Sequence, residues 1–297
     1  MRSTSVSSTS VGIARPFTGL FFMLSSSIVF TIMNILIKTI DARYTAWHLG
    51  FFRFLGGVIL LNLVFAKGGN LFKGDNIPLL LGRGCTGTVA FISLVTAMRM
   101  LPLSTSIIIF YTFPVFAAIS AFFLYKERIY LSQMFCIALV ILGILVLFNF
   151  NISGSWFGQS MALTGAVFTG LTVTLIRSLR GKNGPVVIYL FFCIVGSIIT
   201  FPMVALNPVI PSSLLEFLMI AGIILTSAGA QLLMNQGFFY CSGWEGGVYM
   251  STEAVFTSLT GILLMGEIVS WNFFVGGMLI LGSGVLLNYF KRRLVFS

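Results

Sequence analysis

Long apolar stretches separated by short polar connections run along the whole sequence. A helix needs about 20 mostly apolar residues to cross the roughly 30 Å hydrocarbon core of a bilayer. Stretches of this length, bounded by charged residues, Gly, Pro or Asn, occur at residues 17–37, 46–66, 78–98, 103–124, 131–149, 156–176, 186–205, 214–236, 246–265 and 271–290. The connections between them are too short to hold a soluble domain. The pattern therefore predicts an all-α integral membrane protein with ten transmembrane helices.

The composition indicates that lipid, and not water, is the main solvent of this chain. Of its 297 residues, 58% are hydrophobic and 8% are charged, whereas soluble domains carry about a quarter charged residues. The formal net charge of +10 would suit nucleic acid binding, but Lys and Arg occur singly or in short clusters between apolar runs. This distribution is typical of residues that anchor helix ends at the membrane surface. We therefore expect the lipid bilayer, and no nucleic acid, as a partner.

The positions of Lys and Arg also predict the orientation. With the N-terminus inside, the inner side holds Arg2, Arg15, Lys67, Lys73, Arg83, Lys126, Arg128, Arg177, Arg180, Lys182, Lys291, Arg292 and Arg293. The outer side holds only Lys38, Arg43 and Arg99, and Arg53 lies within the second helix. Because basic residues are enriched on the cytoplasmic side, we expect both termini in the cytoplasm, in an inner or plasma membrane. Residues 1–14 then form a flexible cytoplasmic tail and residues 292–297 a cytoplasmic C-terminus.

The two halves of the sequence repeat one another. Residues 112–127, TFPVFAAISAFFLYKE, match residues 252–267, TEAVFTSLTGILLMGE, at a constant offset of 140. An offset of 139 aligns the first helix with the sixth, and the fifth with the tenth. Because each repeat has an odd number of helices, five, the second repeat enters the membrane from the opposite side. We therefore predict two inverted five-helix repeats, residues 15–150 and 156–291.

The repeated segments resemble a known family. The segment from Ala97 to Leu147, the segment from Asn235 to Leu287 and the pair Arg53 and Phe54 are similar to the EamA-type ten-helix transporters of the drug/metabolite transporter (DMT) superfamily. The resemblance implies a substrate cavity between the two halves and transport of small metabolites. Members of the family often carry Pro where this chain has Ala254, so we do not expect a proline-dependent kink in the ninth helix.

Ionisable and polar side chains within the predicted helices are the candidates for solute binding or coupling. An ionised side chain at the centre of a membrane costs about 2.5–3.5 kcal/mol on insertion scales, so its presence suggests a function. Glu253 is a candidate ligand for a substrate ammonium group or a candidate proton carrier, and the alternative is a structural carboxylate. Arg53 is a candidate too, and the alternatives are an arginine bonded to backbone carbonyls or an anchor whose charged end extends to the membrane surface. The uncharged candidates are Asn34, Thr96, Tyr111, Gln231, Asn235 and Tyr249.

These features favour a secondary transporter that moves a small amino-acid-like or amphipathic solute by alternating access, with efflux as the expected direction. One alternative is proton-coupled uptake of a nucleobase or a cofactor-like metabolite. Another is an accessory membrane subunit that transports nothing. The solute, the coupling ion and the oligomeric state stay open at this point.

Enzymatic activity, metals and cofactors are not expected. The pair Gly181 and Lys182 lacks the spacing of a phosphate-binding loop. One His and seven acidic residues leave few groups for a catalytic cluster. The four cysteines are far apart, at positions 85, 136, 193 and 241, and show no metal-binding or disulfide spacing.

Overall fold

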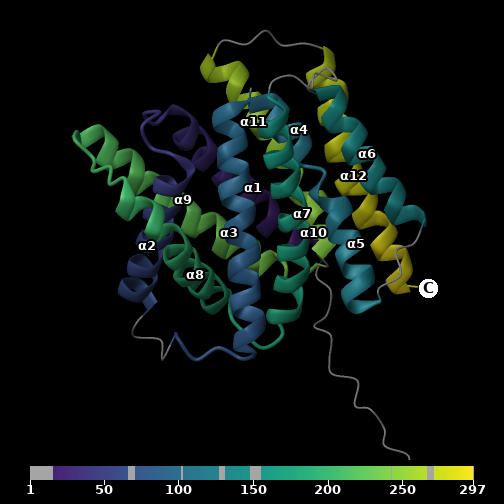
Figure 1. Ribbon diagram of the computed structural model, residues 1–297. Coiled ribbons are helices and arrows are strands. Elements are labelled where there is room, and N and C mark those ends of the chain that lie inside the picture. Colours follow the sequence, from purple (N-terminus) through teal and green to yellow (C-terminus); the bar gives the residue numbers. More distant parts are fainter. Residues whose placement is uncertain are drawn as a thin grey trace, which may run out of the picture.

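The computed structural model (Figure 1) describes residues 16–65, 71–101, 103–126, 131–147, 155–241, 243–265 and 271–296. Within these ranges the regular elements are all helices. They are α1 (Pro16–Thr39), α2 (Ala46–Phe65), α3 (Ile77–Met100), α4 (Leu103–Phe110), α5 (Phe113–Tyr125), α6 (Leu131–Leu147), α7 (Trp156–Leu179), α8 (Pro185–Leu206), α9 (Leu214–Gly237), α10 (Gly243–Met250), α11 (Thr252–Met265) and α12 (Trp271–Phe296).

These helices form the ten spans that the hydrophobic pattern predicts. Helices α1, α2, α3, α7, α8 and α9 are each long and apolar enough to cross a membrane. The fourth span consists of α4 and α5, the ninth of α10 and α11, and α6 and α12 are the fifth and tenth. Large apolar side chains point outward, with Leu63 78%, Phe123 74% and Met278 74% exposed, which suits contact with lipid. The all-α membrane fold is confirmed.

Two spans are interrupted near their middle. The fourth breaks at Tyr111 and Thr112, between α4 and α5, and Pro114 lies in the first turn of α5. The ninth breaks at Ser251, where no proline is present. There the hydroxyls of Ser251 and Thr252 donate to the carbonyls of Gly247 and Tyr249, at 3.0 and 2.8 Å. Hydroxyl groups bonded to the preceding turn can bend a helix, so the ninth span is broken although it lacks the proline of its counterpart.

The contacts between helices are symmetric with respect to the two inverted repeats. The most extensive contacts join α3 to α7 and α1 to α9. Because α1 corresponds to α7 and α3 to α9, these two contacts are equivalent under the exchange of the repeats. The other large contacts, α2 with α8 and α6 with α12, join corresponding helices. In Figure 1, α6 and α12 lie side by side at the right, and α2, α8 and α9 lie at the left.

Polar contacts join the two repeats at one end of the bundle, where α1 ends and α9 begins. Arg43 donates to the carboxylate of Glu216 and, at 2.8 Å, to the hydroxyl of Ser212. The Tyr44 hydroxyl donates to the same Glu216 oxygen at 2.9 Å. Hydrogen bonding to Glu216 raises the pKa of the Arg43 guanidinium above its ordinary value. We call these four residues the Arg43 cluster.

A second set of contacts joins the repeats at the opposite end, between the α2–α3 and α7–α8 connections. The Asp75 backbone N–H donates to the Asn183 Oδ1 at 2.8 Å, and the Asn183 Nδ2 donates to the Asp75 carbonyl at 3.0 Å. The Lys182 ammonium lies 3.6 Å from a carboxylate oxygen of Asp75. We call these three residues the Asp75 cluster. The two repeats are therefore held together at both ends of the bundle.

Candidate solute-binding cavity

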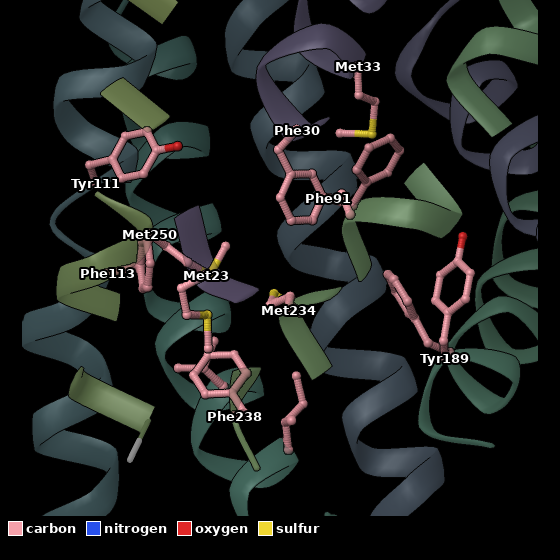
Figure 2. Close-up of a cluster of buried hydrophobic side chains, with 14 of the residues drawn as sticks. Met23, Phe30, Met33, Phe91, Tyr111, Phe113, Tyr189, Met234, Phe238 and Met250 are labelled. Carbon is pink, nitrogen blue, oxygen red and sulfur yellow. The ribbon is translucent and has the colours of Figure 1, made fainter. Parts of the chain in front are cut away.

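A cavity of about 100 Å³ lies between the two repeats. Among the described residues, its lining comes from α1 to α5 of the first repeat and from α7 to α11 of the second, including the Tyr111 that separates α4 from α5. The aromatic part of the wall consists of Phe30, Phe91, Phe110, Tyr111, Phe113 and Phe192. Figure 2 shows several of these rings with Met33, Met234 and Met250, which line the same space. The wall is therefore largely aromatic and apolar.

Glu253 is the acidic group of this wall. It lies in the first turn of α11, directly after the break in the ninth span, and its side chain is buried. The Asn34 Nδ2 on α1 donates to the Glu253 Oε1 at 2.6 Å. The interruption places the N-terminus of a half-helix in the cavity wall, where the helix dipole favours negative charge. Local backbone geometry and Asn34 thus both stabilise a carboxylate here.

Arg53 on α2 is one of two basic groups in the wall. Its side chain is only 1% exposed, so it does not extend to the membrane surface. Its Nε donates to the hydroxyl of Ser227 on α9. The guanidinium carbon lies 4.1 Å from the centroid of the Phe91 ring and 5.4 Å from that of Phe192. The group is therefore held by a hydroxyl and by aromatic faces.

Arg83 on α3 is the second basic group, and it is completely buried. Its Nη2 donates to the Gln231 Oε1 at 2.9 Å, and its guanidinium carbon lies 4.0 Å from the Phe192 centroid. The charge count along the sequence assigns Arg83 to the inner membrane surface, and its position in the structure corrects this. It lies within the predicted third span, so the criterion that selected Arg53 would have found it.

Neither arginine has a carboxylate partner among the described residues. Glu216 pairs with Arg43, and Asp75 lies near Lys182. The Nε and Nη1 atoms of Arg83 are buried and have no hydrogen-bond partner. A buried charge whose partner is removed typically costs a protein about 3–5 kcal/mol. Both guanidinium groups therefore lie in the cavity wall without a counter-charge among the described residues, which makes them candidates for contact with a ligand.

The cavity brings together some of the residues selected from the sequence and leaves others apart. Glu253, Arg53, Tyr111 and Gln231 line it, and Asn34 contacts Glu253. The other three lie elsewhere. The Thr96 hydroxyl donates to the Ile92 carbonyl of its own helix, the Asn235 Nδ2 donates to the Pro185 carbonyl, and Tyr249 is buried in the apolar core.

Comparison with known proteins identifies the family. The model of the EamA-like transporter family matches residues 17–149 and 156–289. This chain belongs to the EamA-like transporter family. It is therefore an integral, multi-pass membrane protein, and its family moves small solutes across membranes.

Two proteins similar to this EamA-like transporter are an exporter and a solute carrier by name. The pseudopaline exporter CntI of Pseudomonas aeruginosa (strain UCBPP-PA14) is 25% identical over 276 residues, which cover 93% of this chain and 97% of the relative. Solute carrier family 35 member G1 of Homo sapiens is 24% identical over 290 residues, covering 91% and 78%. A solved crystal structure with 16% identity has a TM-score of 0.77 and covers 93% of this chain and 99% of its own. It shows the same fold.

Proposed function

We propose that this EamA-like transporter exports a small amino-acid-like solute through the central cavity by alternating access. The observation that carries the proposal is the cavity itself, which lies between two inverted repeats and is lined by ionisable groups that lipid would not tolerate. Glu253 binds the ammonium group of the solute, and the aromatic wall covers its apolar part. The exporter among the relatives supports the outward direction.

The contacts between the repeats support alternating access. The Arg43 cluster and the Asp75 cluster close opposite ends of the bundle. Since the ion pair in each cluster is partly exposed, it exchanges for water contacts at little cost in free energy. Loss of one cluster at a time would open the cavity to one side at a time. In the proposed orientation, with both termini cytoplasmic, the Arg43 cluster lies on the outer side.

The limits of the two moving units follow from the same proposal. We propose residues 15–150 and 156–291 as the repeats that rock against one another, each with five spans. Small residues at the contact between helices allow sliding or rotation without loss of packing.

Flux into or out of liposomes tests the proposed function. The purified full-length chain is reconstituted, and vesicles are loaded with mixed radiolabelled amino acids. We expect loss of at least one label to be faster than from vesicles without protein, and unlabelled solute on the other side to accelerate this loss by counter-exchange. Counter-exchange requires a binding site that faces each side in turn. Equal rates with and without protein for every small organic solute assayed would contradict the proposal.

Loss of one end cluster should open one side of the cavity. Thr169 lines the cavity, so Thr169→Cys in a background without native cysteines reports access to an impermeant thiol reagent. Arg43→Gln should speed labelling from the Arg43 end, and Lys182→Gln should speed labelling from the opposite end. Since the side chains of Arg43 and Lys182 are partly exposed, neither change should shift the unfolding temperature by much. Identical labelling patterns in the two variants would argue against these clusters as gates.

A further inference from the structure

Two positive charges share one aromatic ring in the cavity wall. The guanidinium carbons of Arg53 and Arg83 lie 5.4 and 4.0 Å from the centroid of Phe192. We infer that Arg53 and Arg83 form a binding site for the carboxylate group of the transported solute. This inference rests on the proposed function, because it assigns a binding site to the carboxylate group of the same solute, whose ammonium group binds Glu253.

The arginines lack the negative charge that their burial requires. Among the described residues, no Asp or Glu pairs with either of them. The side chain of Arg83 is 0% exposed and keeps its Nε and Nη1 without a hydrogen-bond partner. The two groups also repel one another as like charges. An anion in the cavity would satisfy the free N–H groups and remove the repulsion at the same time.

The surroundings hold the guanidinium groups in place without neutralising them. Ser227 and Gln231 each supply one neutral oxygen, and the rings of Phe91 and Phe192 cover the planar faces. The Nε and Nη1 of Arg83 keep their N–H groups without a partner, and these groups can donate to a ligand in the cavity. Gly87 keeps space beside Arg83, since a Cβ at this position would lie 3.0 Å from the Arg83 Nη1 and 3.0 Å from the Phe192 ring. The site is therefore built for the planar fork of an arginine.

The chemistry of the whole cavity favours a carboxylate over a phosphate. Arginine forks bind both kinds of oxyanion. The same cavity, however, contains Glu253, and a doubly charged phosphate beside it would add repulsion in a site shielded from water. A singly charged carboxylate on a solute that also carries an ammonium group matches both the arginines and Glu253. The site therefore fits a zwitterionic amino-carboxylate.

Thermal unfolding of the purified full-length chain in detergent tests the site without requiring transport. The probes are the standard amino acids, their amides and the matching decarboxylated amines, with sodium phosphate and added sodium chloride as separate arms. We expect at least one amino acid to raise the unfolding temperature by several degrees. Its amide and its amine should give little or no shift, because each lacks the carboxylate.

Arg83→Met is the decisive variant, because methionine has a similar apolar length and no charge. It should abolish the shift given by the amino acid. It should also raise the unfolding temperature of the empty protein, since it removes a buried charge without a counter-charge. Arg99→Met is the matched control: Arg99 is a half-buried arginine on the same helix, outside the cavity lining. This control should keep the response to the amino acid.

Several results would overturn the site. One is an empty Arg83→Met protein that unfolds at a lower temperature than the unchanged chain, because that is the mark of a structural arginine. Others are an equal shift from the amide, from phosphate or from chloride. The proposed function and the carboxylate site are refuted by different results. Carboxylate binding without flux would leave the site standing and refute transport, whereas flux that survives Arg83→Met unchanged would leave transport standing and refute the site.

Discussion

Glu253→Gln should lower the initial rate of solute flux about tenfold or more, equivalent to about 1.4 kcal/mol, and should flatten its dependence on pH. The change removes the negative charge of the cavity wall and keeps the size of the side chain. The amide oxygen of the new residue can still accept from the Asn34 Nδ2, which donates to Glu253 at 2.6 Å in the native chain. We therefore expect normal expression and an unfolding temperature close to that of the unchanged protein. The measurement is flux from proteoliposomes over a range of pH.

Glu245→Gln is the matched control for this change. Glu245 is a buried carboxylate of the same span, in α10, and it does not line the cavity. Its replacement should leave the pH profile of flux unaltered. A Glu253→Gln protein that transports at the normal rate at every pH would remove Glu253 from the mechanism. If that variant still exchanges solute but no longer responds to a pH gradient, Glu253 carries a proton and does not bind the solute's ammonium.

Gly170→Ala should destabilise the fold and reduce transport. Gly170 lies on α7 at its contact with α5, and a Cβ there would lie 2.6 Å from the Ala117 backbone nitrogen and 2.7 Å from the Phe116 carbonyl carbon. Backbone atoms, unlike side chains, cannot relieve the clash by a change of rotamer, so the two helices must separate. Overpacking of this kind costs about 1–3 kcal/mol. The expected result is a lower unfolding temperature in detergent, followed by tryptophan fluorescence.

The control for Gly170→Ala is Gly82→Ala on α3. A Cβ at Gly82 meets no atom within 4 Å. Both substitutions replace glycine within a helix, which by itself favours the helix by about 1 kcal/mol. Gly82→Ala should therefore keep or slightly raise the unfolding temperature. If Gly170→Ala is as stable as Gly82→Ala, the contact between α5 and α7 is not as close as the structure indicates.

The hydrophobic pattern was enough to predict the spans. A bilayer forces every backbone polar group of a crossing segment into a helix, so length and hydropathy alone located the ten spans. The break in the ninth span was not predicted, because the sequence signal considered was proline. At this break the hydroxyls of Ser251 and Thr252 donate to the preceding turn, but such bonds also occur within helices that stay unbroken, as at Thr88 of α3.

The candidate site was predicted only in part, for a related reason. Burial of an ionisable residue in a span can be inferred from one segment, and this led to Glu253 and Arg53. The role of Arg83 depends on Phe192 of α8 and Gln231 of α9, which approach it only after both repeats have packed. Thr96 and Gln231 are both uncharged polar residues within predicted spans. The Thr96 hydroxyl nevertheless bonds to its own helix. The alternation of hydrophobic and polar residues along an apolar helix is too weak to show which face of the helix lines the cavity.

The sequence by itself determined the class of the protein, the number of its spans and the duplication of its halves, because lipid imposes the same length and polarity on every crossing segment. Only the tertiary structure decided which buried groups share one cavity. It brought together Glu253 of one repeat and the two arginines of the other, because contacts between helices far apart in sequence select one face of each. The charge pattern of the cavity, and the zwitterionic solute we infer from it, depend on that arrangement.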